Sequence, residues 1–246
     1  MGSKVKGARG LARELATVYG DQLISVILYG SGAREEHRDR LSDLNVLVLL
    51  ERADPAALRK ASAVAGRWAR RGNPPPLILA ADDWDRSRDV FPIEFAEIAD
   101  ARRVLLGSDP FEGLSVPREQ LRAQCEYELR SRFIQLREQY LLHARDPKRL
   151  AQTALRSVST FLVLFRTVLR LLGTAVPPDS AAVVERTAGV VGFDAGPILE
   201  LLRLRAEAGR PRLTADGPLL EGYLSAVAET VHFVDRLPPT STREDS

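Results

Sequence analysis

The spacing of apolar residues changes once along this chain, near residue 113, and this change constrains the fold more than any other feature of the sequence. Before it, short apolar runs alternate with stretches of helical spacing; after it, only helical spacing is evident. Gly107, Pro110 and Gly113 provide turn residues at the change. We therefore expect an α+β protein with a mixed α/β domain over 1–112, an all-helical bundle over 113–237 and a disordered tail over 238–246.

Apolar and β-branched runs predict the strands of the first domain, and helical periodicity predicts the remaining elements. The expected strands are Leu23–Tyr29, Leu44–Leu50, Leu77–Ala80 and Ile93–Ala99, with Val104–Leu106 as a candidate extension of the fourth. Helices are expected over 4–19 and 54–71 in the first domain, and over 117–143, 147–173, 179–191, 195–208 and 214–236 in the second. The two long helices share a short loop, so they should pack antiparallel.

Composition excludes several classes of protein. The 246 residues include 35 Lys and Arg against 33 Asp and Glu, and a formal net charge of +2 is too small to drive binding to nucleic acid or an anionic membrane. The single cysteine, Cys125, cannot form an internal disulfide and falls on the apolar face of its helix, where we expect a buried thiol. No apolar run has the length of a bilayer span or follows the N-terminus as a signal peptide would, so we expect a cytoplasmic protein.

The segment from Ile24 to Leu50 carries the polar residues with the clearest chemistry. Gly30 and Ser31 end an apolar strand in a tight turn, whose amides and hydroxyl suit a phosphate group. Asp43 and Asn45 enter the next strand two residues apart, so their side chains point to the same side at the edge of that turn. Oxygen ligands beside a phosphate site suit a Mg²⁺-bound triphosphate.

This segment resembles the nucleotidyltransferase superfamily with the polymerase-beta-like fold, in particular the small bacterial members related to kanamycin nucleotidyltransferase. The resemblance rests on Gly30 to Arg34 (GSGAR) and, eleven residues after Ser31, on the run from Ser42 to Asn45 (SDLN). It implies transfer of a nucleoside monophosphate from Mg²⁺-bound NTP, taken as ATP, to a hydroxyl of a small-molecule or protein acceptor. It also implies roles in nucleotide binding for Gly30, Ser31, Arg34 and Ser42, and in catalysis and metal binding for Asp43, Asn45 and Glu94. The helical second domain is similar, more loosely, to the bundle that helps these enzymes bind the acceptor.

Two departures from the family pattern are visible. Asn45 stands where the second aspartate is expected and brings no charge to a metal, and Glu35 stands where glycine is frequent. The third carboxylate is Glu94 or Glu97, which would face opposite ways on a strand, and Glu94 fits the family pattern better. The sequence therefore predicts an enzyme of reduced activity, with an inactive nucleotide sensor or protein-interaction module as the alternative.

A second pattern lies in the helical half. Arg137 and His143 have the spacing of the Arg and His pair of HEPN ribonucleases, which would make the helical domain a nuclease. Such a spacing arises readily by chance in an arginine-rich chain, and the alternative is a pair of solvent-facing helix residues.

Overall fold

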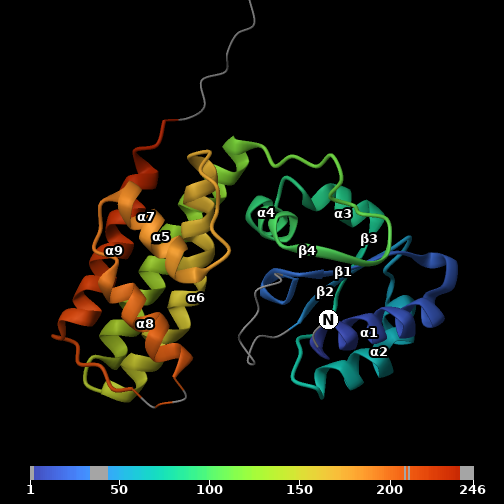
Figure 1. Cartoon of the computed structure of the whole chain (residues 1–246), viewed down its shortest axis with the longest axis horizontal. Coiled ribbons are helices and arrows are strands. Elements are labelled where there is room, and N and C mark those ends of the chain that lie inside the picture. Colours follow the sequence, from blue (N-terminus) through green and yellow to red (C-terminus); the bar gives the residue numbers. More distant parts are fainter. Residues whose placement is uncertain (1–2, 34–43, 208, 210, 239–246) are drawn as a thin grey trace, which may run out of the picture. The chain divides into compact units, whose positions relative to one another are not determined.

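The computed structural model describes residues 3–33, 44–207, 209 and 211–238. The chain forms two compact units, Met1–Val116 and Pro117–Ser246. The predicted α+β class is confirmed: a mixed sheet with flanking helices precedes a bundle of helices (Figure 1). The sequence predicted the boundary between the two domains near residue 113. Most of the predicted disordered tail, 238–246, lies outside the described residues.

A four-stranded sheet in the order β3-β2-β1-β4 forms the centre of the first unit. Its strands are β1 (Leu23–Tyr29), β2 (Asn45–Leu50), β3 (Leu77–Ala80) and β4 (Arg102–Gly107). β1 pairs antiparallel with both β2 and β4, whereas β2 and β3 are parallel. The two central strands are almost entirely buried, which explains why they appear in the sequence as continuous apolar runs.

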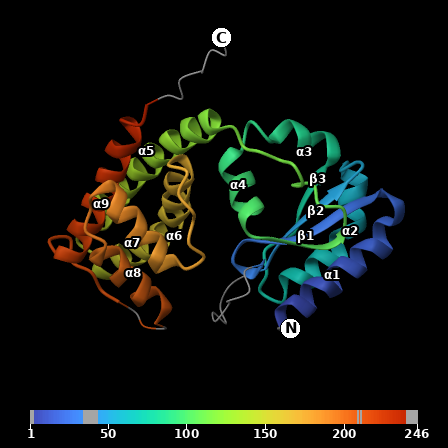
Figure 2. The same cartoon turned by 45° about the horizontal axis from the view of Figure 1, so that its top comes forward.

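Helices cover both faces of this sheet (Figure 2). On one face α1 (Ser3–Tyr19) and α2 (Pro55–Ala69) share a core with Val26, Leu28 and Val48. On the other face α3 (Ala81–Ser87) and α4 (Pro92–Asp100) share a smaller core with Ile27, Leu47 and Leu49. The aromatic side chains of Trp84, Phe95 and Phe111 pack together in that second core.

The strand predicted over Ile93–Ala99 is wrong, because these residues form α4. Ile93 and Phe95 alternate with Glu94, as in a half-buried strand, but Ala96 and Ile98 are buried as well, and this spacing fits one face of a helix. Pro92 lies in the first turn, where a missing N–H costs no hydrogen bond. The fourth strand is β4, which contains the run Val104–Leu106 as a separate element rather than as an extension.

The second unit is helical throughout its described part. It comprises α5 (Arg118–His143), α6 (Pro147–Leu171), α7 (Ser180–Val191), α8 (Gly196–Ala206) and α9 (Pro218–Asp235). α6 lies at the centre, with twelve buried residues, and α5 packs alongside it. Asp146 begins α6 by accepting hydrogen bonds from the N–H groups of Lys148 and Arg149.

Cys125 is fully buried in α5, as expected for a small apolar side chain. Burial raises the pKa of its thiol to about 12, so the unreactive neutral form dominates at neutral pH. In the described part of the chain, no helix has both the length and the apolar character that crossing a bilayer requires.

Candidate functional site

A tight turn follows β1 and places Gly30 at the edge of the sheet. Gly30 has φ of +71°, a conformation that favours glycine, and its N–H donates a hydrogen bond to the carbonyl of Ala101 over 2.8 Å. A Cβ atom at Gly30 would lie 3.4 Å from the Asn45 side-chain nitrogen. The structure therefore brings Gly30 and Asn45 together, as the sequence suggested.

Three polar or aromatic residues form a row across the sheet beside this turn. Tyr29 at the end of β1 pairs with Asn45 at the start of β2 on one side and with Arg102 at the start of β4 on the other. Paired residues of neighbouring strands point to the same face, and Tyr29 packs against the core under α3 and α4. Burial raises the pKa of Tyr29, so its phenol is neutral at neutral pH. The row thus presents an amide, a neutral phenol and a guanidinium.

The neighbouring strand adds no carboxylate to this row. β2 and β3 pair from Leu47↔Leu77 to Leu50↔Ala80, and none of the four residues of β3 carries a carboxylate. Asn73 accepts a hydrogen bond from the Leu44 N–H over 3.2 Å and ties the loop before β3 to the start of β2.

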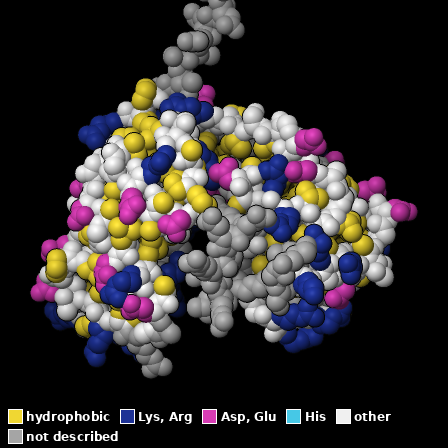
Figure 3. Space-filling model, in the orientation of Figure 1, with side chains coloured by type: hydrophobic (Ala, Val, Ile, Leu, Met, Phe, Trp, Pro, Cys, Tyr) yellow, Lys and Arg dark blue, Asp and Glu magenta, His cyan; other side chains and the backbone are white. Residues whose placement is uncertain are grey.

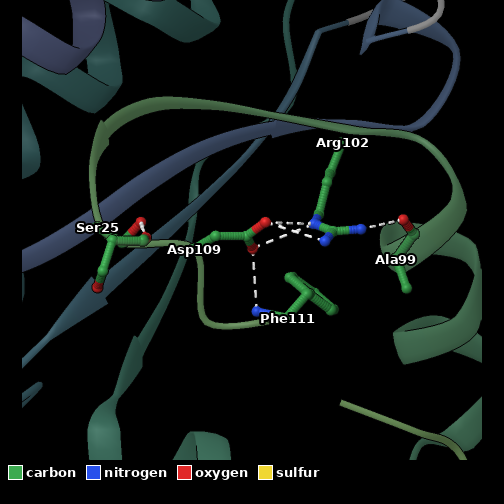
Figure 4. A network of polar contacts seen from close by, with 6 residues as sticks. Ser25, Ala99, Arg102, Asp109 and Phe111 are labelled. Carbon is green, nitrogen blue, oxygen red and sulfur yellow. Dashed lines mark hydrogen bonds and ion pairs between the residues drawn. The ribbon is translucent and has the colours of Figure 1, made fainter. Parts of the chain in front are cut away.

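The guanidinium of Arg102 is neutralised by Asp109 (Figure 4). Its Nε and Nη2 atoms donate to the Asp109 carboxylate over distances of 2.9 to 3.1 Å, while Nη1 donates to the carbonyl of Ala99. The guanidinium also lies 5.2 Å from the centroid of the Phe111 ring. This bidentate pair fixes the loop after β4 and leaves the row without net charge.

Asp109 has a lowered pKa as a consequence of this network. Partial burial alone would raise the pKa of its carboxyl, but the hydrogen bonds from Arg102 and from the Phe111 N–H outweigh that effect. The buried Ser25 hydroxyl binds the same loop by donating to the Ser108 carbonyl over 2.6 Å. Sequence analysis missed Arg102 and Asp109, because nothing in their spacing indicates that a strand start and the following loop fold together.

Several predicted site residues lie where the structure gives no description. Arg34, Ser42 and Asp43 fall outside the described residues, and only the backbone of Ser31 is described, in the turn Gly30–Ala33. The roles of these residues therefore stay predictions.

The two glutamates considered as the third carboxylate lie on α4 rather than on a strand. Glu94 is exposed in the first turn of the helix, and Glu97 is half-buried one turn later. Three residues apart on a helix, they point to roughly the same side instead of opposite sides. α4 ends just before Ala101, whose carbonyl accepts a hydrogen bond from the Gly30 N–H. Measured along the helix axis, Glu97 therefore lies nearer than Glu94 to the turn that begins at Gly30.

The described residues at this edge do not form a metal site by themselves. Within the described residues, no three Asp, Glu, His or Cys side chains come together as a metal site. Asn45 can offer one neutral oxygen, which needs a carboxylate nearby to hold Mg²⁺. The backbone N–H groups of the turn that begins at Gly30 could still bind a phosphate group.

The structure separates the two residues of the ribonuclease-like pattern. The guanidinium of Arg137 lies over the Phe133 ring at 5.5 Å, on the exposed surface of α5. Nδ1 of His143 instead lies 3.1 Å from the Thr153 hydroxyl, in a groove that Arg137 does not line.

Comparison with known proteins shows a likeness of fold. No family model matches the sequence, and no curated protein is significantly similar to it. Among solved structures, the chain is similar to spectinomycin adenyltransferase AAD(9) from Enterococcus faecialis, determined with ATP and spectinomycin. The TM-score is 0.61 at 10% sequence identity, over 94% of this chain and 99% of that one. The chain thus shares its fold with that adenyltransferase.

Proposed function

We propose that this protein binds a nucleoside triphosphate at the turn after β1 and transfers its nucleoside monophosphate slowly to an acceptor hydroxyl. The observation that carries the proposal is the placement of Gly30 beside Asn45, at one edge of a sheet whose fold is that of a nucleotidyltransferase. The same edge is where Asp43 enters β2 in the sequence.

Each residue of this edge has a role in the proposal. Gly30 and Ser31 hold the triphosphate through the turn amides, with Arg34 and Ser42 as further contacts. Asp43 supplies the carboxylate for Mg²⁺, Asn45 supplies a neutral oxygen, and Glu97 or Glu94 is the further carboxylate. Bound Mg²⁺ would offset the charge of the triphosphate during transfer. The activity is slow because Asn45 occupies a position at which a carboxylate would strengthen that metal site.

The acceptor in the proposal is a hydroxyl-bearing small molecule or protein. The structurally similar adenyltransferase was solved with ATP and spectinomycin, and the match covers 99% of its chain. ATP is accordingly the first donor to test. With a net charge of +2, long RNA is the least attractive acceptor.

Calorimetry tests the binding step directly. Wild-type protein is titrated with ATP and with GTP, each with and without Mg²⁺, alongside the Asp43→Ala variant. We expect Mg²⁺-dependent binding that Asp43→Ala weakens by about a hundredfold or more, because a metal–carboxylate contact is lost. Equal binding by wild type and variant would contradict the proposal.

A catalytically inactive nucleotide-binding or protein-interaction module is the second candidate, and the row Asn45, Tyr29, Arg102 favours it because it carries no carboxylate. Asn45→Asp tests between the two. If the remaining machinery is intact, this variant should release pyrophosphate from ATP at least about tenfold faster than wild type in the presence of an acceptor.

Asn73→Asp is the matched control for Asn45→Asp. It adds the same charge at the same end of the sheet and keeps an oxygen that accepts from the Leu44 N–H, but it lies outside the row. The module is favoured if ATP binds and both variants release no pyrophosphate above wild type. An increase in both variants would mean that added charge, not the position of Asn45, is responsible.

A further inference from the structure

A polar groove lies between α5 and α6, entirely within the helical unit. Its volume is about 450 Å³, which is in the range of small-molecule sites. One face of α5 and one face of α6 line it, with buried Leu136 and Phe161 among the lining residues. The nucleotide site proposed above uses none of these residues.

The charge of the groove is positive. Among the described residues that line it, Arg132, Arg149 and Arg156 are basic and none is Asp or Glu. Arg132 is paired with Glu128 over 3.0 Å and Arg149 with Asp146 over 3.5 Å. These two partners lie outside the groove lining and offset part of the charge.

Arg156 is the cation that these pairs leave unmatched. It is exposed in the middle of α6 and has no hydrogen bond or ion pair with any other residue that the structure describes. α6 itself carries basic residues and no acidic one, so the helix offers no carboxylate at helical spacing to neutralise Arg156.

The remaining polar groups suit hydroxyl groups. Gln139 and Gln152 each offer an amide that both donates and accepts hydrogen bonds, whereas the Gln135 oxygen already accepts from Arg132 Nη1 over 3.3 Å and leaves its NH₂ group to donate. The Nδ1 atom of His143 is held at 3.1 Å from the Thr153 hydroxyl, which orients the imidazole at one end of the groove. A guanidinium without a partner beside several amides therefore presents complementary chemistry to a phosphate joined to hydroxyl-bearing carbons.

We propose that this groove binds a small phosphorylated polyol, such as a sugar phosphate, with Arg156 contacting the phosphate and the glutamine amides contacting the hydroxyls. The inference does not depend on the proposed nucleotidyl transfer. It follows from the three arginines, the three glutamines and the volume of the groove.

The test uses the full-length protein and ribose 5-phosphate, with ribose and inorganic phosphate as the uncharged and the phosphate-only probes. Proton NMR of the histidine ring protons reports the site, with the His143 signal identified by its loss in His143→Gln. We expect ribose 5-phosphate to shift the His143 signal with saturation, and to bind at least about tenfold more tightly than either ribose or phosphate.

Arg156→Gln is the decisive variant. It should weaken ribose 5-phosphate binding about tenfold or more, whereas Arg186→Gln, a substitution of another exposed mid-helix arginine on α7, should change it less than about twofold. Both side chains are exposed, so thermal unfolding should stay unchanged in both variants. No shift of the His143 signal, an equal effect of the two substitutions, or binding of an RNA oligonucleotide in preference to ribose 5-phosphate would overturn the proposal.

Discussion

Gly107 shows how one residue can decide the geometry of an edge strand. It has φ of +81°, and a Cβ atom there would lie 2.0 Å from the Ile24 carbonyl oxygen on the neighbouring strand. The backbone of Ile24 and Ser25, rather than a flexible side chain, would have to move to make room for that Cβ atom. The close pairing of β4 with β1, which positions Arg102 beside Tyr29, therefore depends on glycine at this position.

Replacing Gly107 by alanine should lower the free energy of unfolding of the first unit by about 3 kcal/mol. Urea unfolding followed by tryptophan fluorescence measures this. Gly72→Ala is the control, since Gly72 also has positive φ, at +84°, but has no atom within 4 Å of the added Cβ; it should cost about 1 kcal/mol. Equal losses in the two variants would show that the contact with Ile24 plays no part.

The ion pair of Asp109 with Arg102 should make stability depend on pH in the acid range. Because the folded-state pKa of Asp109 is lowered, its contribution is fully present above the ordinary aspartate pKa of about 4 and disappears as the pH falls through the lower folded value. At pH 7, Asp109→Asn should lower the free energy of unfolding by about 1 kcal/mol. Urea unfolding between pH 7 and pH 2 should show the difference from wild type shrinking only below about pH 4. A difference that does not vary with pH would exclude the ion pair as its cause.

At the scale of elements, α4 decides which carboxylates can serve the candidate site. As a strand, Ile93–Ala99 would have placed one glutamate in the sheet; as a helix it turns Glu94 to the surface and leaves Glu97 half-buried. Short amphipathic segments fit both periodicities, and packing of Phe95 against Trp84 and Phe111 selects the helix. The row across the sheet end is thereby left with Asn45, Tyr29 and Arg102.

At the scale of the whole molecule, the chain contains separate reporters for its two units. Both tryptophans, Trp68 and Trp84, are buried in the first unit, and the one cysteine, Cys125, is buried in the second. Each unit has its own buried core, so we expect each to unfold as its own cooperative transition. Fluorescence and thiol labelling in urea can follow the two transitions in one protein.

Core substitutions test this independence. Leu129 is fully buried on α5, so Leu129→Ala should lower the free energy of unfolding of the second unit by about 3 kcal/mol. This variant should shift the urea midpoint measured by Cys125 labelling and leave the midpoint measured by tryptophan fluorescence unchanged. Leu28→Ala in β1 should do the reverse. A shift of both midpoints by either substitution would show that the units unfold as one.

The surface is consistent with the near balance of charges in the sequence. Figure 3 shows basic and acidic side chains interspersed over much of the visible face. The cationic groove between α5 and α6 is a local feature. α6 contains no Asp or Glu, and the acidic residues of α5 are not among those that line the groove. The net charge of the sequence sums over the whole chain, so it cannot reveal such a local site.

The sequence by itself determined the elements that are long or fully buried. β1, β2 and the helices from α5 to α9 were predicted within a few residues, because continuous apolar runs and sustained helical spacing admit one periodicity. The approach of Gly30 to Asn45 was also predicted, since a strand, a turn and the next antiparallel strand bring those positions together locally.

Tertiary structure alone decided the features that depend on distant partners. Packing of Phe95 against two aromatic rings made α4 a helix, strand register set Arg102 beside Tyr29, and the loop after β4 folded back to pair Asp109 with Arg102. The α5–α6 groove likewise exists only after two helices pack. Each depends on contacts between segments whose proximity no local pattern encodes, because side-chain periodicity specifies which face is buried but not what it is buried against.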